Sequence, residues 1–431
     1  MSPLLSGALF TLLVCLLGTA GAEAGPTVIV ISLDGVRHDY PDKAHLPALA
    51  RMQEQGLRAG RMRPVFPSST FSNHVSLATG TYPDRHGIVD NRFWDRERGL
   101  YDYEKGEGPS WLKAEPLWVT AERQGIPAAT LFWVGSRKPW NGVSAQYRRE
   151  TFDSGVSERA KVDQILEWLD LSERDRPGLI MSWWHGADRA GHKFGPDSAE
   201  VIEALEEQDA ELGRLLAGLD ARKAWGQVTL LVVSDHGMLA VEGSVPLAER
   251  FEAAGIPARV QHGTAVAHIF LDDPSDRDRA EALIAEDSGL QAYRGGELPE
   301  ALRLAHPQRT GDLVVLIDPP RSFAREELLP RVYFGARRLW NPQARQGKHG
   351  YAPDHPAMGA IFFALGRGVE AGSSPGEVRS VDVASTVTRL LGIDPPKMSE
   401  GTPIAGVGAF LGNTAGAPEP ARVSRSSRAQ D

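Results

Sequence analysis

The sequence of 431 residues is 42% hydrophobic and 24% charged, the composition of a globular protein long enough to bury one large core or two smaller ones. This composition excludes intrinsically disordered and collagen-like chains. The formal net charge is −9, so the chain lacks the basic balance with which proteins bind the nucleic-acid backbone. We therefore expect no stable nucleic-acid complex.

The first 24 residues are typical of a secretory signal peptide. Residues 4–17 are almost free of charge, are too few to span a bilayer, and precede small residues that fit a cleavage site. Because the apolar run has no Lys or Arg before it, an uncleaved anchor stays open as the alternative. Cleavage would also remove Cys15, the only cysteine. We expect a periplasmic or secreted protein without disulfides and without membrane attachment after cleavage.

Three apolar segments predict buried strands, and each is followed by an acidic residue. These segments are 27–33 before Asp34, 178–184 before Asp188, and 228–233 before Asp235. In open parallel sheets, ligand sites lie at the carboxyl ends of the strands. The three carboxylates are therefore candidate site residues.

Apolar residues at helical spacing cover residues 162–169 and 202–219, between the expected strands. Alternating strands and helices predict an α/β fold with a doubly wound, mostly parallel sheet. Large apolar residues become rare after Asn413. We expect one folded domain at 25–412 and a disordered tail at 413–431.

Histidines recur beside the predicted strand ends. His236 follows Asp235 directly, and His192 lies four residues after Asp188, a spacing at which one helical turn aims both side chains at a common point. In a chain without thiols, a zinc site has to be built from carboxylate oxygen and imidazole nitrogen. Taken alone, the Asp188–His192 spacing is more typical of a solvated turn.

A run of hydroxyl side chains at residues 68–70 supplies candidate nucleophiles. Prolines restrict the backbone ahead of Ser68, Ser69 and Thr70, so one hydroxyl can be fixed in space. Spacing does not choose among the three, and an N-cap cluster that opens a helix at Thr70 is an equally good interpretation. The two interpretations are compatible, because the first N–H groups of a helix can hold a phosphoryl oxygen.

Together these segments resemble nucleotide pyrophosphatase/phosphodiesterases, a family of the alkaline phosphatase-like superfamily. The resemblance covers residues 27–412 and is carried by six blocks in order: 33–35 (LDG), 67–74 (PSSTFSNH), 86–91 (HGIVDN), 188–196 (DRAGHKFGP), 234–238 (SDHGM) and 349–351 (HGY). It implies a central, mostly parallel sheet flanked by helices on both faces, with insertions that form the substrate pocket. Residues 25–412 would then be a phosphodiesterase catalytic domain.

The resemblance also implies two Zn²⁺ ions per chain. The first ion would be held by Asp34, Asp235, His236 and Thr70, and the second by Asp188, His192 and His349. Thr70 would be the nucleophile. His355 is the alternative to His349, but His349 opens the His-Gly-aromatic block, so His355 is interpreted as a loop histidine.

On the substrate side, Asn91 matches the residue whose amide contacts a non-bridging phosphoryl oxygen together with the Thr70 N–H. Phe71, Phe152 and Trp183 fall where relatives place aromatic side chains that stack on a base. Core packing is the alternative role for each of these three aromatic residues.

The implied reaction is cleavage of nucleotide phosphodiester and pyrophosphate bonds through a phosphothreonine intermediate, with release of nucleoside 5′-monophosphates. Two divalent ions against three carboxylates leave one positive charge, which matches a monoanionic diester better than a dianionic monoester. Arg37, Arg137 and Lys138 lie near the family blocks, and any of them in the pocket would favour a monoester. A phosphomonoesterase and a lipid or choline-type phosphodiesterase on the same fold stay open as alternatives.

Two further functional classes are alternatives to hydrolysis. A non-catalytic binding protein on a degenerate scaffold would have lost a ligand or the nucleophile, and this chain keeps all seven positions. Phosphotransfer to an acceptor alcohol would use the same phosphothreonine. His74 and His86, which belong to the family blocks, are expected to make structural hydrogen bonds.

Overall fold

The computed structural model describes residues 25–102, 111–149, 153–323, 334–340 and 345–408. The expected signal peptide at 1–24 and the expected tail at 413–431 lie outside the described residues, as does Phe152. Within these ranges, none of the helices has the length and apolar character needed to cross a membrane.

A seven-stranded sheet forms the centre of the molecule, with the strand order β2-β16-β9-β1-β8-β6-β7. Its strands are β1 (Thr27–Leu33), β2 (Leu57–Arg58), β6 (Ala128–Leu131), β7 (Tyr147–Arg148), β8 (Leu179–Trp184), β9 (Val228–Val233) and β16 (Phe362–Gly366). Strands β9, β1, β8, β6 and β7 are parallel, whereas β16 runs antiparallel to β9 and β2. All seven residues of β1 are buried, as expected for a strand covered on both faces.

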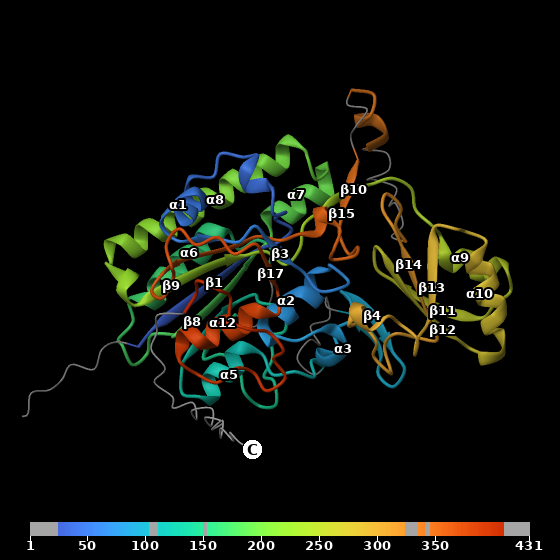
Figure 1. Cartoon of the computed structure of the whole chain (residues 1–431), viewed down its shortest axis with the longest axis horizontal. Coiled ribbons are helices and arrows are strands. Elements are labelled where there is room, and N and C mark those ends of the chain that lie inside the picture. The colour runs from blue at the N-terminus through green and yellow to red at the C-terminus, as the bar shows by residue number, and fades with distance from the viewer. Residues whose placement is uncertain (1–24, 103–110, 150–152, 324–333, 341–344, 409–431) are drawn as a thin grey trace, which may run out of the picture.

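Helices cover both faces of this sheet (Figure 1). One layer contains α1 (Pro47–Gln55), α6 (Glu158–Leu169), α7 (Gly186–Phe194) and α8 (Ala199–Ala221); the other contains α2 (Thr70–Thr79), α3 (Pro83–His86), α5 (Leu117–Arg123) and α12 (Asp382–Leu391). The two predicted helical stripes lie in α6 and α8. The expected α/β fold is therefore confirmed.

Residues 245–323, between β9 and β16, form an inserted lobe with its own core (Figure 1). Its four-stranded antiparallel sheet has the order β11-β12-β14-β13, built from β11 (Ala258–His262), β12 (Val266–Leu271), β13 (Leu290–Arg294) and β14 (Leu313–Ile317). Helices α9 (Leu247–Ala253) and α10 (Arg277–Ala285) pack beside this sheet.

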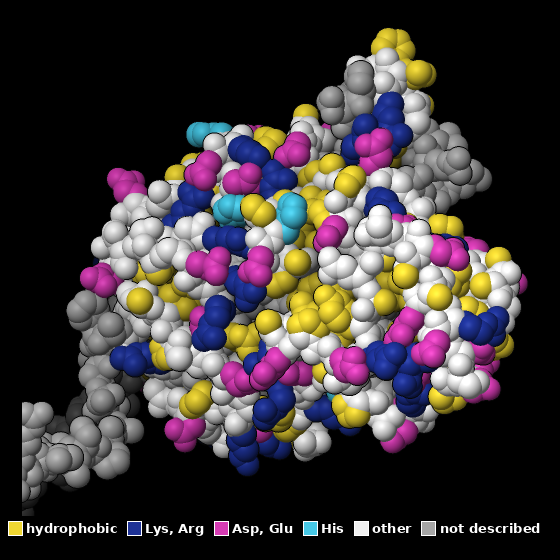
Figure 2. Space-filling view, turned by 45° about the vertical axis from the view of Figure 1, so that its right-hand side comes forward, with side chains coloured by type: hydrophobic (Ala, Val, Ile, Leu, Met, Phe, Trp, Pro, Cys, Tyr) yellow, Lys and Arg dark blue, Asp and Glu magenta, His cyan; other side chains and the backbone are white. Residues whose placement is uncertain are grey.

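Short paired strands and turns complete the described fold. The pairs are β3 (Arg61–Arg63) with β17 (Glu377–Arg379), β4 (Arg92–Asp95) with β5 (Gly99–Asp102), and β10 (Leu239–Val241) with β15 (Gln346–Lys348). The 3-10 turns are η1 (Tyr40–Asp42), η3 (Ala224–Gly226), η4 (Pro274–Asp276), η5 (Glu300–Leu302) and η6 (Pro356–Met358). In Figure 2, basic and acidic side chains are interspersed over the face shown.

Candidate active site

Three neighbouring strands bring the three acidic residues together. Asp34 directly follows β1, and Asp188 lies in the first turn of α7, just beyond β8. The Asp188 N–H donates to the Asp34 carbonyl (3.1 Å), and the Gly35 N–H donates to Asp235 Oδ1 (3.1 Å). Gly35 has φ +70°, and a Cβ there would stand 2.9 Å from Asp188 Cβ, so the turn after β1 requires glycine. The predicted convergence at one sheet edge is what the structure shows.

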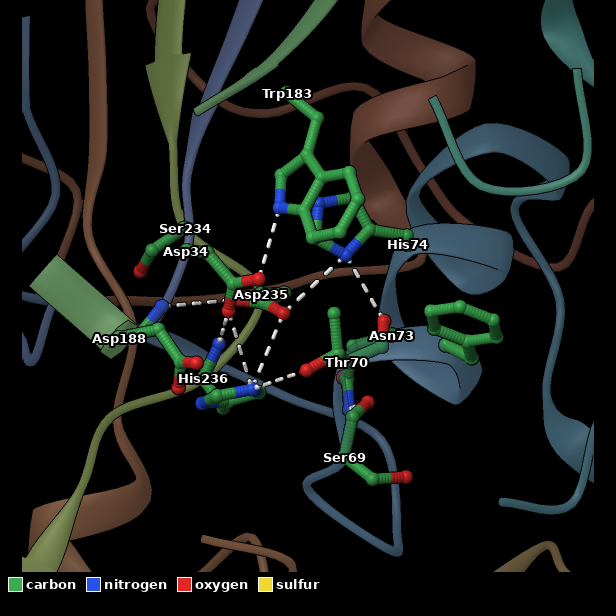
Figure 3. A network of polar contacts seen from close by, with 12 residues as sticks. Asp34, Ser69, Thr70, Asn73, His74, Trp183, Asp188, Ser234, Asp235 and His236 are labelled. Carbon is green, nitrogen blue, oxygen red and sulfur yellow. Dashed lines mark hydrogen bonds and ion pairs between the residues drawn. The ribbon is translucent and has the colours of Figure 1, made fainter. Parts of the chain in front are cut away.

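Asp34, Asp235 and His236 form a buried cluster that we call the inner group (Figure 3). His236 Nε2 lies 3.5 Å from Asp34 Oδ1 and 3.1 Å from Asp235 Oδ2. Thr70 Oγ1 lies 3.1 Å from the same nitrogen. The four residues predicted for the first ion therefore share one point in space.

Asp188, His192 and His349 form a second cluster, which we call the outer group. His192 Nε2 and His349 Nε2 lie 3.4 and 3.8 Å from Asp188 Oδ1, and 3.2 Å from each other. The His349 ring stacks on the His236 ring of the inner group, with centroids 3.7 Å apart. His355 instead accepts a hydrogen bond from the Ala357 N–H, in a turn.

Backbone carbonyls orient all three imidazoles in these groups. The Nδ1 contacts run from His236 to Gly237 O (2.9 Å), from His192 to Gly347 O (2.9 Å) and from His349 to Ser68 O (3.0 Å). A carbonyl only accepts, so each Nδ1 carries the proton and each Nε2 presents a lone pair to the carboxylates. A hydrogen bond from the Nδ1–H to a carbonyl is one that metal-binding histidines ordinarily make.

The electrostatics of the two groups call for cations. Burial and the neighbouring His236 hold the pKa of His349 well below its ordinary value, and burial together with the neighbouring Asp235 and Asp188 raises the pKa of Asp34 well above its ordinary value. Among the described residues, one buried oxygen of each of the three aspartates has no hydrogen-bond partner. Imidazole lone pairs and carboxylate oxygens at these distances repel one another unless a positive ion lies between them. The residues thus fit divalent metal ions.

The three adjacent hydroxyls at residues 68–70 have different surroundings. The Ser68 hydroxyl donates to the Tyr351 carbonyl (2.8 Å), and the Ser69 hydroxyl lies 3.3 Å from that of Ser72. Only the Thr70 hydroxyl, among these three, faces the inner group. Thr70 is also the first residue of α2, with Ser69 in extended conformation as N-cap. Both interpretations of the hydroxyl run therefore apply to the same residue.

Asn91 lies beside the start of α2. Its Oδ1 accepts a hydrogen bond from the Phe71 N–H (2.8 Å), which determines which side of the amide carries the NH₂ group. Phe71 is half-buried and packs against the core below α2. The roles of Asn91 and Phe71 in binding substrate stay predictions.

Trp183 and His74 contact the inner group directly (Figure 3). The Trp183 indole N–H donates to Asp34 Oδ2 (2.8 Å), a contact that its expected role as a base-stacking residue did not include. His74 Nδ1 lies 2.9 Å from Thr70 O and 3.2 Å from Asp235 Oδ2. His74 was expected to be structural, and its position four residues after Thr70 was the available signal for this contact, since i and i+4 share a helix face.

The three basic residues near the family blocks differ in their contacts and exposure. Arg37 pairs with Asp39 (2.6 Å) and Asp197 (2.7 Å) and donates to the Met238 carbonyl (3.0 Å). Lys138 is exposed and Arg137 is half-buried. Arg37 is therefore committed to structural contacts.

Comparison with known proteins gives consistent matches. The family described as type I phosphodiesterase / nucleotide pyrophosphatase matches residues 28–352. A venom phosphodiesterase of Crotalus durissus collilineatus is 30% identical over 389 residues, covering 87% of this chain and 45% of the venom protein. An uncharacterized pyrophosphatase/phosphodiesterase of Schizosaccharomyces pombe is 41% identical over 353 residues, covering 79% of this chain and 71% of that protein.

A solved structure has the same architecture. Murine ectonucleotide pyrophosphatase/phosphodiesterase 5, an inactive variant in complex with AMP, matches with a TM-score of 0.77 and 25% identity, covering 86% of this chain and 96% of that chain. The chain spans about half the length of the venom phosphodiesterases that it matches.

Proposed function

Because the chain belongs to the type I phosphodiesterase / nucleotide pyrophosphatase family, we propose that it hydrolyses nucleotide phosphodiester and pyrophosphate bonds and releases nucleoside 5′-monophosphates. The observation that carries this proposal is the Thr70 hydroxyl, held at the start of α2 and 3.1 Å from His236 of the inner group. The similar murine protein was captured with AMP, which supports a nucleotide as ligand.

Two Zn²⁺ ions are the proposed cofactors. The inner group with Thr70 would hold one ion and the outer group the other, and nitrogen and oxygen donors of this kind suit zinc. When bound, two divalent ions supply the positive charge that stabilises the entering and departing oxygens of an in-line displacement.

Thr70 is the proposed nucleophile of a two-step displacement. The Thr70 hydroxyl gives up its proton to solvent, and its oxygen forms a bond to phosphorus while the bond to the leaving alcohol or phosphate breaks. The departing group takes up a proton, and a phosphothreonine that still carries the nucleoside is left. Water then attacks phosphorus, the Thr70 oxygen departs and regains a proton, and the nucleoside 5′-monophosphate is released. The Asn91 amide and the Thr70 N–H at the start of α2 would hold a non-bridging oxygen during both steps.

The site favours a diester over a monoester. A dianionic phosphate is ordinarily held by additional cationic side chains. Arg37, the most buried candidate, is paired with Asp39 and Asp197.

We further propose Phe71 and Trp183, with Phe152 outside the described residues, as the surface for the base. Residues 1–24 would direct the protein to the periplasm or the exterior.

The test is a rate comparison on the purified, zinc-loaded protein. p-Nitrophenyl thymidine 5′-monophosphate and p-nitrophenyl phosphate share a leaving group, so the ratio of their kcat/KM values reports the preference for a diester. We expect a ratio of at least about a hundredfold, or about 2.7 kcal/mol of transition-state discrimination. A preference for the monoester would overturn the diesterase proposal and leave a phosphomonoesterase on the same fold. Thr70→Ala is the blank.

A further inference from the structure

A buried carboxylate connects the nucleophile to the inserted lobe. Asp90 is 5% exposed and precedes Asn91 in the loop after α3. It accepts a hydrogen bond from the Asn91 N–H (2.7 Å), and the Ser69 hydroxyl, which donates to Ser72 Oγ, is its other polar neighbour. Because burial of a carboxylate is costly without such donors, these two contacts hold the side chain in place.

The two polar neighbours of Asp90 flank the proposed phosphoryl site. Ser69 is the N-cap of α2, and its carbonyl accepts from the Asn73 N–H (3.1 Å), so its position sets where Thr70 begins the helix. Asn91 in turn accepts from the Phe71 N–H (2.8 Å). The Asp90 carboxylate thus links the residue before Thr70 to the backbone of Asn91, whose side-chain amide would hold the non-bridging oxygen.

The inserted lobe contacts this carboxylate from the opposite side. Gly263 lies in the turn between β11 and β12, and a Cβ built there would stand 2.2 Å from Asp90 Oδ2. The turn is held within the lobe, because the Gly263 N–H donates to Val266 O (2.9 Å) and the Phe323 N–H donates to Thr264 O (2.8 Å). Asp90 Oδ2 therefore packs directly against the backbone at Gly263, where a residue without a Cβ leaves room for it.

The same turn also lies against the outer group. A Cβ built at Gly350, the residue after His349, would stand 3.4 Å from Thr264 Cβ. The Tyr351 hydroxyl donates to the Arg321 carbonyl of the lobe (2.8 Å). One turn of the lobe thus contacts both the segment that carries an outer-group histidine and the carboxylate beside the nucleophile.

We propose that Asp90 is a positioning residue for phosphoryl transfer, and that the β11–β12 turn of the inserted lobe holds its carboxylate against Ser69 and Asn91 through Gly263. This inference rests on the proposed function. The lobe then has a role beyond packing, because it sets the geometry of Thr70 and Asn91.

The test is a double-mutant cycle. Gly263→Ala places a methyl group against Asp90 Oδ2 without backbone strain, since Gly263 does not have a positive φ. Gly296→Ala is the matched control, because it lies in the same lobe, has no positive φ, and its Cβ would meet nothing within 4 Å. We expect Gly263→Ala to lower kcat/KM for p-nitrophenyl thymidine 5′-monophosphate about tenfold. Gly296→Ala should match the parent protein.

The second arm of the cycle tests the contact itself. In an Asp90→Ala background the carboxylate is gone, so Gly263→Ala should have no further effect on kcat/KM. Asp90→Ser replaces the alanine variant if that variant does not fold. An undiminished Gly263→Ala effect in this background would overturn the proposal. So would a Gly263→Ala protein with a lowered unfolding midpoint and unchanged kcat/KM, because that result describes a purely structural contact.

Binding of AMP separates this inference from the proposed function. Zinc content should be the same in the parent and in Gly263→Ala, while calorimetry should show AMP binding weakened about tenfold in Gly263→Ala and unchanged in Gly296→Ala. A parent protein that neither binds AMP nor cleaves the diester would refute the proposed function, and the inference with it. A parent that does both, with a Gly263→Ala protein that matches it, would refute the inference alone.

Discussion

The inner and outer groups use the same chemistry at different depths. The inner side chains are almost fully buried, with Asp34 2% exposed and Asp235 and His236 0% exposed. In the outer group, Asp188 is 18% and His192 32% exposed. The inner group lies on the ends of adjacent central strands, whereas the outer group uses helix α7 and the segment after β15. The difference indicates that the buried inner group positions Thr70, and that the outer group is the more exposed to solvent.

Removing the nucleophile should separate chemistry from metal binding at the inner group. In Thr70→Ala we expect diester turnover to fall by at least about a thousandfold, because no other hydroxyl of the 68–70 run faces His236. Zinc content should stay near that of the parent. Thr79→Ala, in the same helix with its hydroxyl bonded to Val75 O, is the control and should keep its activity. Normal turnover in Thr70→Ala would show that Thr70 is not the nucleophile.

Removing one carboxylate from each group should show which ion depends on which set. Asp188→Ala takes away the only carboxylate of the outer group, so we expect one ion to be lost and diester turnover to fall by about a hundredfold or more. Asp34→Ala leaves Asp235 and His236 in the inner group. Metal analysis of both variants measures the outcome. Two ions bound undiminished by Asp188→Ala would contradict the assigned outer group.

The Trp183 indole N–H donates to the inner group, so a change at Trp183 should weaken binding of the inner ion more than binding of the outer ion. Trp183→Phe removes the indole N–H that donates to Asp34 Oδ2, and we expect affinity for the inner ion to fall by about 10 to 100-fold. Trp184→Phe is the matched control, since its indole donates to Ser182 Oγ, away from the carboxylates. Competition with a chelator measures both. Equal zinc affinity in the two variants would show that the Trp183 contact does not tune the inner group.

Both groups form only in the folded protein, and we expect the folded state to lose stability in acid. Burial lowers the pKa of His268, in the lobe, from an ordinary 6.5 to about 4. Between these values the unfolded chain takes up a proton that the native state does not, so stability falls as pH decreases from about 6.5 to 4, by about 1.4 kcal/mol per pH unit for this residue. Urea unfolding at several pH values measures the slope. It should flatten by one proton in His268→Leu, and an unchanged slope would contradict neutral burial of His268.

The sequence predicts the positions of those site residues that are placed by the end of a strand or by their spacing within a helix. The strand ends after β1, β8 and β9 place Asp34, Asp188 and Asp235 at one sheet edge, as predicted, because parallel strands end on the same side. The four-residue spacing of Asp188 and His192 also gave the expected proximity, because both lie in α7.

Contacts between distant segments carry no such local signal. The carbonyls of Gly347 and Ser68 that orient His192 and His349 come from chain segments more than a hundred residues away, and any residue type has a carbonyl. The approach of Gly263 to Asp90 likewise depends on how the inserted lobe docks. These parts of the site are tertiary, so the sequence did not reveal them.

The most direct test of the account is to identify the residue that becomes covalently modified during turnover. The zinc-loaded protein would be mixed with a radiolabelled dinucleotide, quenched in acid within one turnover, digested, and its labelled peptide sequenced. The proposed mechanism predicts a nucleotidyl group on Thr70, and no label in Thr70→Ala. Label on Ser68 or Ser69, or a labelled Thr70→Ala protein, would contradict it.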